Sequence, residues 1–233
     1  MGDPGPDMPA DFSDNLRALS RLMEQWSGTP LDSAGVLRRL NPGGSRTPLF
    51  WIFNSKREPE RLAAALGPDQ PLIYGRSLHM IVPEASLKLD VGRRLAAHYA
   101  DALRPAVGDG LLCVGANCQG TSIAMEVVRR LNRERPVVPA LAFINARPGD
   151  RLDLPKLLFY GEEDPQSDPF REDPDAASRG FGPHRREVLS GVSHGGYFEV
   201  GTVERVAAGL RSYFDEVESA SAMRNDARSP TTG

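Results

Sequence analysis

Cys118 is the residue of this chain best placed to do chemistry. It lies between Gly115 and Gly120, after the apolar run 111–114 and before the helical pattern 121–131. Strand, glycine-flanked cysteine and helix form the context of a nucleophile elbow of the Gly-x-Cys-x-Gly kind, whose sharp turn holds the apex side chain at the mouth of a pocket. We therefore expect Cys118 to be a nucleophile. The alternative is a tight strand–helix turn in which Cys118 only fills space.

A nucleophilic cysteine needs help, because it attacks as a thiolate and a free thiol is mostly protonated at pH 7. The helix that begins after Cys118 favours the anion through its N-terminal dipole. The expected base is His194, which lies between the last predicted strand and the last predicted helix and precedes Gly195-Gly196. The remaining histidines are expected to be structural or exposed: His79, His98 and His184.

A third group should orient the imidazole of the base and stabilise its charged form. Asp164 follows the buried run 156–161 and is the preferred candidate. The order Cys118, Asp164, His194 is the nucleophile–acid–base order that accompanies nucleophile elbows. Asn145, at the end of the preceding strand, is the competitor, because an amide can also hold the ring.

An oxyanion formed during attack by Cys118 would need hydrogen-bond donors. One is expected to be the backbone N–H of Gln119, the residue after the nucleophile. The other is expected from the loop after an early strand, which contains Asn54 and Ser55. Position alone supports that second assignment.

The elements that must position these groups alternate along the chain. Apolar runs predict strands at 48–53, 71–75, 111–114, 139–145, 156–161 and 186–189, and helical periodicity predicts helices at 13–26, 59–66, 87–103, 121–131 and 203–217. Such alternation predicts an α/β fold with a mostly parallel sheet covered on both faces. Functional groups in such sheets lie at the carboxyl ends of the strands.

Composition excludes several classes of function. The net charge of −3 gives no basic field for nucleic acid or an anionic membrane, and no apolar run in the sequence could span a bilayer. The N-terminus does not resemble a signal peptide. We expect no disulfide between Cys113 and Cys118, no metal and no bound cofactor, and we expect a cytoplasmic protein.

Patterning along the chain divides it into four segments. Residues 1–12, rich in Pro, Gly and Asp, are expected to be a disordered N-terminus, and the polar run 218–233 a disordered tail. Residues 13–45 are expected to form a leading helix and a linker. The catalytic domain is expected over 46–217.

From about residue 36 to residue 217 the chain resembles the α/β-hydrolase thioesterase domains of nonribosomal peptide and polyketide synthesis. The phrases at 66–75 and 95–105, followed by the elbow, carry this resemblance in the expected order. It implies an acyl or peptidyl group on the phosphopantetheine of a carrier protein, which passes to the elbow nucleophile. Water, an internal nucleophile or another small-molecule acceptor would then release it.

The chain departs from that family at four places. Cys118 replaces the more usual serine, and Asn145 replaces an aspartate, which moves the acid role toward Asp164. The loop at Asn54 and Ser55 lacks the usual Gly-Gly of the oxyanion segment. The short connection 146–155 leaves no room for the long helical lid, so the lid should be reduced or absent, with 166–184 as a small substitute cover.

Two other readings remain open. A lidless domain with this order of cysteine, aspartate and histidine also resembles dienelactone hydrolase, which opens a small lactone with an elbow cysteine. A hydrolase fold can also serve as a non-catalytic binding module. Residues 13–26 weakly resemble the last helix of a carrier domain, so the chain is compatible with a free-standing enzyme and with a piece of a larger synthase.

Overall fold

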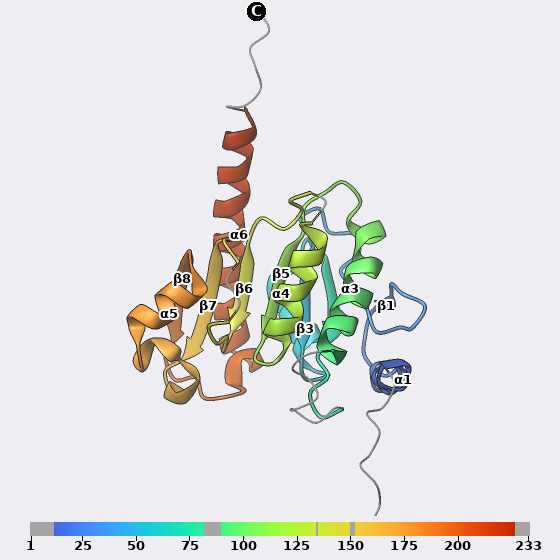
Figure 1. Cartoon of the computed structure of the whole chain (residues 1–233), viewed down its shortest axis with the longest axis horizontal. Helices are drawn as coiled ribbons and strands as arrows, with labels where there is room; N and C mark the ends of the chain where they lie inside the picture. Colours follow the sequence, from blue (N-terminus) through green and yellow to red (C-terminus); the bar gives the residue numbers. More distant parts are fainter. Residues whose placement is uncertain (1–11, 82–89, 134, 150–151, 227–233) are drawn as a thin grey trace, which may run out of the picture.

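The computed structural model describes residues 12–81, 90–133, 135–149 and 152–226. Its centre is an eight-stranded sheet in the order β1-β2-β4-β3-β5-β6-β7-β8 (Figure 1). The strands are β1 (Thr29–Pro30), β2 (Arg38–Leu40), β3 (Leu49–Phe53), β4 (Leu72–Arg76), β5 (Cys113–Asn117), β6 (Leu141–Ile144), β7 (Lys156–Gly161) and β8 (His184–Leu189). The helices are α1 (Phe12–Met23), α2 (Glu58–Leu66), α3 (Val91–Val107), α4 (Gly120–Leu131), α5 (Pro174–Phe181) and α6 (Thr202–Asp226).

The six strands from β3 to β8 run parallel, and β2 joins β4 in antiparallel register at one edge. Helices α3 and α4 pack together on one face, while α2 and α6 pack together on the other (Figure 1). Because both faces are covered, the central strands are apolar on both sides, and all five residues of Leu49–Phe53 are buried. The expected fold class, a mostly parallel sheet with helices on both faces, is confirmed.

The segment 13–45 is more than a helix and a linker. Its part 29–40 forms β1 and β2, which extend the sheet, and Val36 and Leu37 are fully buried. Trp26 follows α1 and stacks on Tyr74 with ring centroids 6.1 Å apart. Leu22 of α1 is exposed.

Helix α6 continues to Asp226, nine residues beyond the expected end at Val217. The segment 218–226, assigned to the disordered tail from its polar composition, is therefore helical as far as the structure describes it. Alanine, glutamate, methionine and arginine are good helix formers, and the hydroxyl of Ser219 donates to the carbonyl of Asp215 at 2.8 Å. Figure 1 shows this end of α6 projecting beyond the sheet. The expectations for 1–11 and 227–233 lie outside the described residues.

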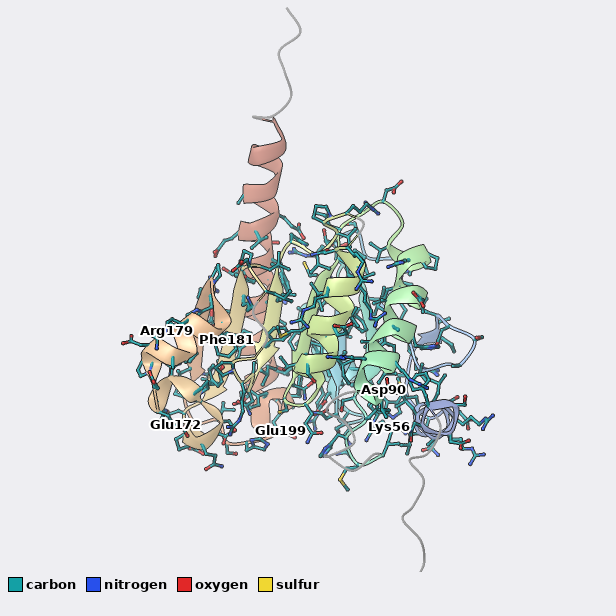
Figure 2. The ribbon with its side chains drawn as sticks, in the orientation of Figure 1. Lys56, Asp90, Glu172, Arg179, Phe181 and Glu199 are labelled. Atoms are coloured by element: carbon teal, nitrogen blue, oxygen red, sulfur yellow. The ribbon has the colours of Figure 1, made fainter. Side chains whose placement is uncertain are left out.

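The connection between β6 and β7 contains no helix in its described parts, 145–149 and 152–155. The expected absence of a helical lid at this position is confirmed. The segment expected to replace it, 166–184, packs mostly elsewhere. Phe170 stacks on Phe181 at 5.7 Å between ring centroids, and Figure 2 shows Glu172, Arg179 and Phe181 at the β8 end of the molecule, opposite Lys56 and Asp90.

Candidate active site

The turn between β5 and α4 holds Cys118 in a strained conformation. Its φ is 48°, in the left-handed region that costs a residue other than glycine about 1–2 kcal/mol. The Cys118 N–H donates to the carbonyl of Ile144 at 2.8 Å, and the Thr121 N–H donates to the Cys118 carbonyl at 3.1 Å. These bonds hold the apex between the end of β6 and the first turn of α4. The side chain thereby faces a cavity rather than the core.

The glycines around Cys118 serve close packing. A methyl group at Gly115 would lie 2.2 Å from the ring of Trp51, and one at Gly120 would lie 2.9 Å from the side chain of Ile52. Gly115 stands three residues before Cys118, and Ala116 occupies the position two residues before it. The turn therefore departs from a strict Gly-x-Cys-x-Gly pattern on its strand side, where the buried methyl of Ala116 is accommodated.

The expected base and acid lie in direct contact. His194, in the loop after β8, places Nδ1 2.7 Å from Oδ2 of Asp164, in the loop after β7. The side chain of Asp164 is inaccessible to solvent, whereas that of His194 is largely exposed. Burial opposes ionisation of Asp164, but hydrogen bonds from Ser167 and His194 outweigh it and hold the pKa of this carboxyl below its usual value. An ionised Asp164 fixes the proton of His194 on Nδ1 and leaves Nε2 as the basic nitrogen.

Asn145, the alternative third residue, lies in the same cluster. Its amide nitrogen donates to Oδ2 of Asp164 at 3.1 Å and lies 3.5 Å from Nδ1 of His194. The buried hydroxyl of Tyr197 donates to Oδ1 of Asn145 at 2.5 Å, which turns the amide nitrogen toward Asp164. Asp164 thus contacts the imidazole more closely, and Asn145 holds Asp164. Asn145 also has a positive φ, 51°.

The Cys118 thiol is protonated at rest. Burial, reinforced by the negative charges of Glu58 and Asp164, raises the pKa of the thiol to about 11, although a hydrogen bond with Asn145 acts in the opposite direction. At pH 7 nearly all of the protein therefore holds a neutral thiol at this position. A reaction at Cys118 requires a base that removes the proton as the bond to sulfur forms.

The loop expected to supply the second oxyanion donor is already occupied. The backbone N–H groups of Asn54 and Ser55 both donate to Oε2 of Glu58, at 2.9 and 3.1 Å. The side chain of Asn54 accepts from Ser77 and donates to the carbonyl of Asn117. Neither Asn54 nor Ser55 lines the cavity at Cys118. The backbone donors of Asn54 and Ser55 are therefore engaged by Glu58, the first residue of α2, which argues against the predicted oxyanion role of this loop.

Gln119 does lie at the cavity, as expected. It precedes the first residue of α4, so its N–H belongs to the group that has no acceptor within the helix. Its side-chain oxygen lies 2.9 Å from Nδ1 of His79, which fixes the amide at the rim. His79, expected to be structural or exposed, thus supports a cavity-lining residue.

The other two histidines have structural contacts. His98 of α3 pairs with Asp32 at 2.6 Å, and His184 contacts the carbonyl of Gly182 at 2.8 Å. Among the described residues, no group of three or more His, Cys, Asp and Glu side chains could hold a metal ion. In the same part of the chain, no helix has the length and apolar character needed to span a membrane.

Sequence reasoning missed several contributors to the site. Glu58 could have been found, because Ser55-Lys56-Arg57-Glu58 has the Ser-x-x-Glu spacing of a capping box. Ser77 follows β4 at the carboxyl edge of the sheet, where functional groups of parallel sheets gather. The roles of Ser167 and Tyr197 depend on how the segments after β7 and β8 pack against each other, and no local sequence pattern predicts this packing.

A cavity of about 610 Å³ lies over the carboxyl edge of the sheet. Cys118, Gln119, Asn145 and His194 all line it. Its remaining described walls come from the loop after β4, one face of α4 and the loop after β6. From the segment 166–184 only Ser167 is among the described residues that line it, so the expected substitute cover does not close the site.

No protein family matches the sequence, and no curated protein matches it by sequence. Solved structures do match the fold. The thioesterase domain SrfTE, which cyclises the lipopeptide antibiotic surfactin, is 13% identical with a TM-score of 0.57 and covers 80% of this chain and 97% of its own. The NocB thioesterase domain of the nocardicin cluster is 15% identical with a TM-score of 0.58, covering 76% and 97%.

A thermophilic esterase from Thermogutta terrifontis is similarly related, with 14% identity, a TM-score of 0.57 and coverage of 78% of this chain and 93% of its own. At such identities the likeness establishes the fold alone, which is that of the α/β hydrolases.

Proposed function

We propose that this protein is an acyl-transfer or acyl-release enzyme of the thioesterase type. It takes an acyl or peptidyl group from the phosphopantetheine of a carrier protein onto Cys118 and passes it to water, an internal nucleophile or an amine or hydroxyl acceptor. The observation that supports this most strongly is the conjunction of a strained elbow cysteine with a His194–Asp164 pair in one cavity. A turn that served packing alone would need neither the positive φ nor the pair.

In the proposed first half-reaction, Nε2 of His194 accepts the proton of the Cys118 thiol while sulfur attacks the carbonyl carbon of the carrier thioester. The new C–S bond forms as the carbonyl π electrons move to oxygen, and the N–H of Gln119 stabilises that oxyanion. Collapse of the intermediate breaks the bond to the pantetheine sulfur, which leaves with the proton from His194. Asp164 stabilises the charged imidazole between these steps.

In the second half-reaction His194 removes a proton from the acceptor, which attacks the acyl group on Cys118. The acyl–sulfur bond breaks, and the proton returns to the Cys118 thiolate. A thioester intermediate is more reactive than an oxygen ester, which suits transfer to an amine or ring closure as well as hydrolysis. The absence of a helix in the described parts of the β6–β7 connection leaves the acceptor an open route.

The test is covalent trapping of the acyl group. The protein is incubated with acyl-pantetheine thioesters, quenched with acid and mapped by peptide mass spectrometry. We expect the acyl mass on the peptide containing Cys118, retained in Cys113→Ala, lost in Cys118→Ala and slowed about 10²-fold or more in His194→Ala. Cys113 is the matched control because it lies buried on β5, the strand that leads into the turn at Cys118. If no variant and no substrate gives an adduct on Cys118, the binding-module reading replaces the proposal.

A second candidate is hydrolysis of a small lactone or ester by the same cysteine, in the manner of dienelactone hydrolase. The short connection between β6 and β7, which carries no helix in its described residues, favours it. Comparing turnover of acyl-pantetheine thioesters with that of small unsaturated lactones separates the two. Faster acylation by the lactones would rank this candidate first.

A further inference from the structure

Asn145 lies between the nucleophile and the acid of the candidate site. Its amide nitrogen donates to Oδ2 of Asp164 at 3.1 Å, and its side chain also hydrogen-bonds the thiol of Cys118. Backbone bonds fix the places of both ends of this contact. The Cys118 N–H donates to the carbonyl of Ile144 at 2.8 Å, and the Asn145 N–H donates to that of Phe159 at 3.0 Å. The amide therefore has a defined position beside the sulfur.

The orientation of the Asn145 amide follows from its partners. Asp164, whose pKa is lowered, is ionised at neutral pH and can only accept, so the amide nitrogen must face it. The amide oxygen then faces Tyr197, whose hydroxyl must donate, at 2.5 Å. Burial raises the pKa of the Tyr197 hydroxyl above its usual value, so this group stays a donor at neutral pH. Tyr197 thus fixes which end of the amide faces the site.

The amide nitrogen has a donor to spare for the nucleophile. It carries two N–H groups, of which Asp164 accepts one, and the other is available to the sulfur of Cys118. A hydrogen bond to sulfur strengthens when the thiol becomes a thiolate, because the acceptor is then charged. Burial opposes that anion most, and the negative charges of Glu58 and Asp164 add to the opposition. The amide of Asn145 acts against all three.

Backbone geometry alone does not explain this arrangement. Asn145 has a φ of 51°, which asparagine and aspartate both adopt more readily than most residues. Aspartate at this position would place a second carboxyl beside that of Asp164, where two like charges oppose each other. The positive φ also gives no reason for the buried hydroxyl of Tyr197 on the amide oxygen. A neutral amide of fixed orientation suits a sulfur anion that forms close to an ionised carboxylate.

We propose that Asn145 stabilises the Cys118 thiolate during attack, and that Tyr197 is a positioning residue that fixes the Asn145 amide for this purpose. The inference rests on the proposed function for the role of Cys118 as the attacking group. In that step the thiol proton passes to Nε2 of His194 as the C–S bond forms. Asn145 transfers no proton, and its N–H only donates a hydrogen bond to the sulfur as negative charge develops there.

Alkylation by iodoacetamide tests this role without a substrate. The rate at Cys118 is measured in Cys113→Ala protein, so that a single cysteine reacts. Tyr197→Phe leaves the amide oxygen without its donor, and we expect alkylation at pH 8 to slow about threefold. Asn145→Asp removes the N–H that faces the sulfur, whether the new carboxyl is ionised or gives its one proton to Asp164. We expect this variant to react about tenfold more slowly.

The pH dependence separates a weaker thiolate from a blocked one. The rate follows the thiolate fraction, and the pKa of the Cys118 thiol is about 11. At pH 11.5, reached in short pulses, the thiolate of the parent protein predominates. The threefold difference in Tyr197→Phe should therefore narrow to less than about twofold. A change in reagent access alone would keep the ratio of the two rates the same at pH 8 and pH 11.5.

Tyr160→Phe is the matched control. Tyr160 is fully buried, and its hydroxyl donates to the carbonyl of Ala146 at 2.7 Å. This variant loses a similar hydrogen bond one residue from Asn145 but leaves the amide and its partners in place. We expect it to lower the free energy of unfolding about as much as Tyr197→Phe and to leave the alkylation rate unchanged. An equal loss of rate in Tyr160→Phe, or a ratio for Tyr197→Phe that does not narrow, would overturn the inference.

These measurements also separate the inference from the proposed function. If alkylation slows as expected but no thioester acylates Cys118, the amide stabilises the thiolate and the proposed function fails. If an acyl-enzyme forms while Tyr197→Phe and Asn145→Asp react with iodoacetamide as fast as the parent protein, the proposed function stands and the inference is wrong.

Discussion

Cys118 and His194 line one cavity and Asp164 contacts His194, yet the Cys118 thiol is buried enough for its pKa to reach about 11. A neutral thiol differs from a preformed thiolate, because in the proposed reaction the proton leaves the sulfur only as the bond to the substrate carbonyl forms. Because the thiolate is the reactive form, we expect alkylation and oxidation of Cys118 to be slow at pH 7 in the absence of substrate. In the proposed mechanism, attack by such a thiol requires a base, the role we propose for His194.

The two residues behind His194 should differ in their effects. Asp164→Asn removes the charge that stabilises the imidazolium, so we expect acylation of Cys118 to slow about 10²- to 10⁴-fold. Asn145→Ala removes a hydrogen bond to Asp164 but leaves that charge, so we expect a loss of about tenfold. Single-turnover acylation rates measure both. If Asn145→Ala proves the more damaging, the amide is the group that holds the ring.

Glu58 should influence the pKa of the Cys118 thiol. Its negative charge raises the pKa of Cys118, so Glu58→Gln should move the pH midpoint of iodoacetamide alkylation at Cys118 downward. Glutamine keeps an oxygen that can accept from the N–H groups of Asn54 and Ser55, which preserves these two contacts. Peptide mapping across pH 7 to 11 gives the midpoint. A midpoint that stays fixed or rises would mean that the carboxyl of Glu58 is neutral in this range.

For the individual residues of the site, the sequence predicts where they lie in the fold better than it predicts which groups they hydrogen-bond. Cys118, Asp164 and His194 each follow a strand of a parallel sheet, so their gathering at one edge could be foreseen. Their catalytic roles stay predictions. The occupation of the Asn54 and Ser55 N–H groups by Glu58 could not be separated from an oxyanion loop by position alone. The contact of Tyr197 with Asn145 joins residues 52 apart in the sequence, beyond the reach of any local pattern.

Among the elements, the elbow depends on the close approach of β3 to β5. A methyl group at Gly115 would overlap the ring of Trp51 on the neighbouring strand, and both are buried in the middle of the sheet. We expect Gly115→Ala to lower the free energy of unfolding by about 1–3 kcal/mol and to slow acylation by displacing Cys118. Urea denaturation measures the first effect.

The control for Gly115→Ala is Gly43→Ala. Gly43 has no heavy atom within 4 Å of an added methyl group and no positive φ, so its unfolding free energy should change by less than about 0.5 kcal/mol. Equal losses in the two variants would show that the close approach of β3 to β5 is not the reason for glycine at position 115.

Element types were predictable where burial and periodicity agree, as in β7, whose bounds match the apolar run 156–161. The short strand β2 could not be predicted, because the charged residues Arg38 and Arg39 give it no apolar pattern. It forms because pairing with β4 supplies its backbone hydrogen bonds. The end of α6 was misplaced for the opposite reason. Its polar residues lack the apolar stripe that marks a packed helix, but they retain the backbone propensity to form one.

In the molecule as a whole, the leading segment joins the hydrolase core through polar as well as apolar contacts. The hydroxyl of Tyr74 in β4 donates to the carbonyl of Ser27, and the ring of Tyr74 stacks on Trp26. Asp32 connects this segment to α3 through His98 and accepts from the Leu37 N–H at 3.0 Å. Because these contacts cross from residues 12–40 to the central sheet and α3, we expect both parts to unfold together.

The pair of Asp32 and His98 should make that stability depend on pH. Burial opposes ionisation of Asp32, but the hydrogen bonds from His98 and Leu37 prevail and hold its pKa below the usual value. A carboxyl with a lowered folded-state pKa stabilises the fold above its unfolded pKa of about 4, and this contribution disappears as the pH falls through the folded value. Asp32→Asn should therefore cost about 1–3 kcal/mol of unfolding free energy at pH 7, and less below pH 4.

Urea denaturation at a series of pH values, monitored by tryptophan fluorescence, measures this dependence. Asp14→Asn is the matched control, because Asp14 pairs with Arg17 at 2.6 Å with both side chains exposed, where an ion pair contributes less than about 1 kcal/mol. If Asp32→Asn destabilises the protein equally at pH 7 and pH 3, the effect comes from packing and not from the charge. If it produces a second unfolding transition, the leading segment unfolds independently, and the contact of Asp32 with His98 is what couples it to α3 and the sheet.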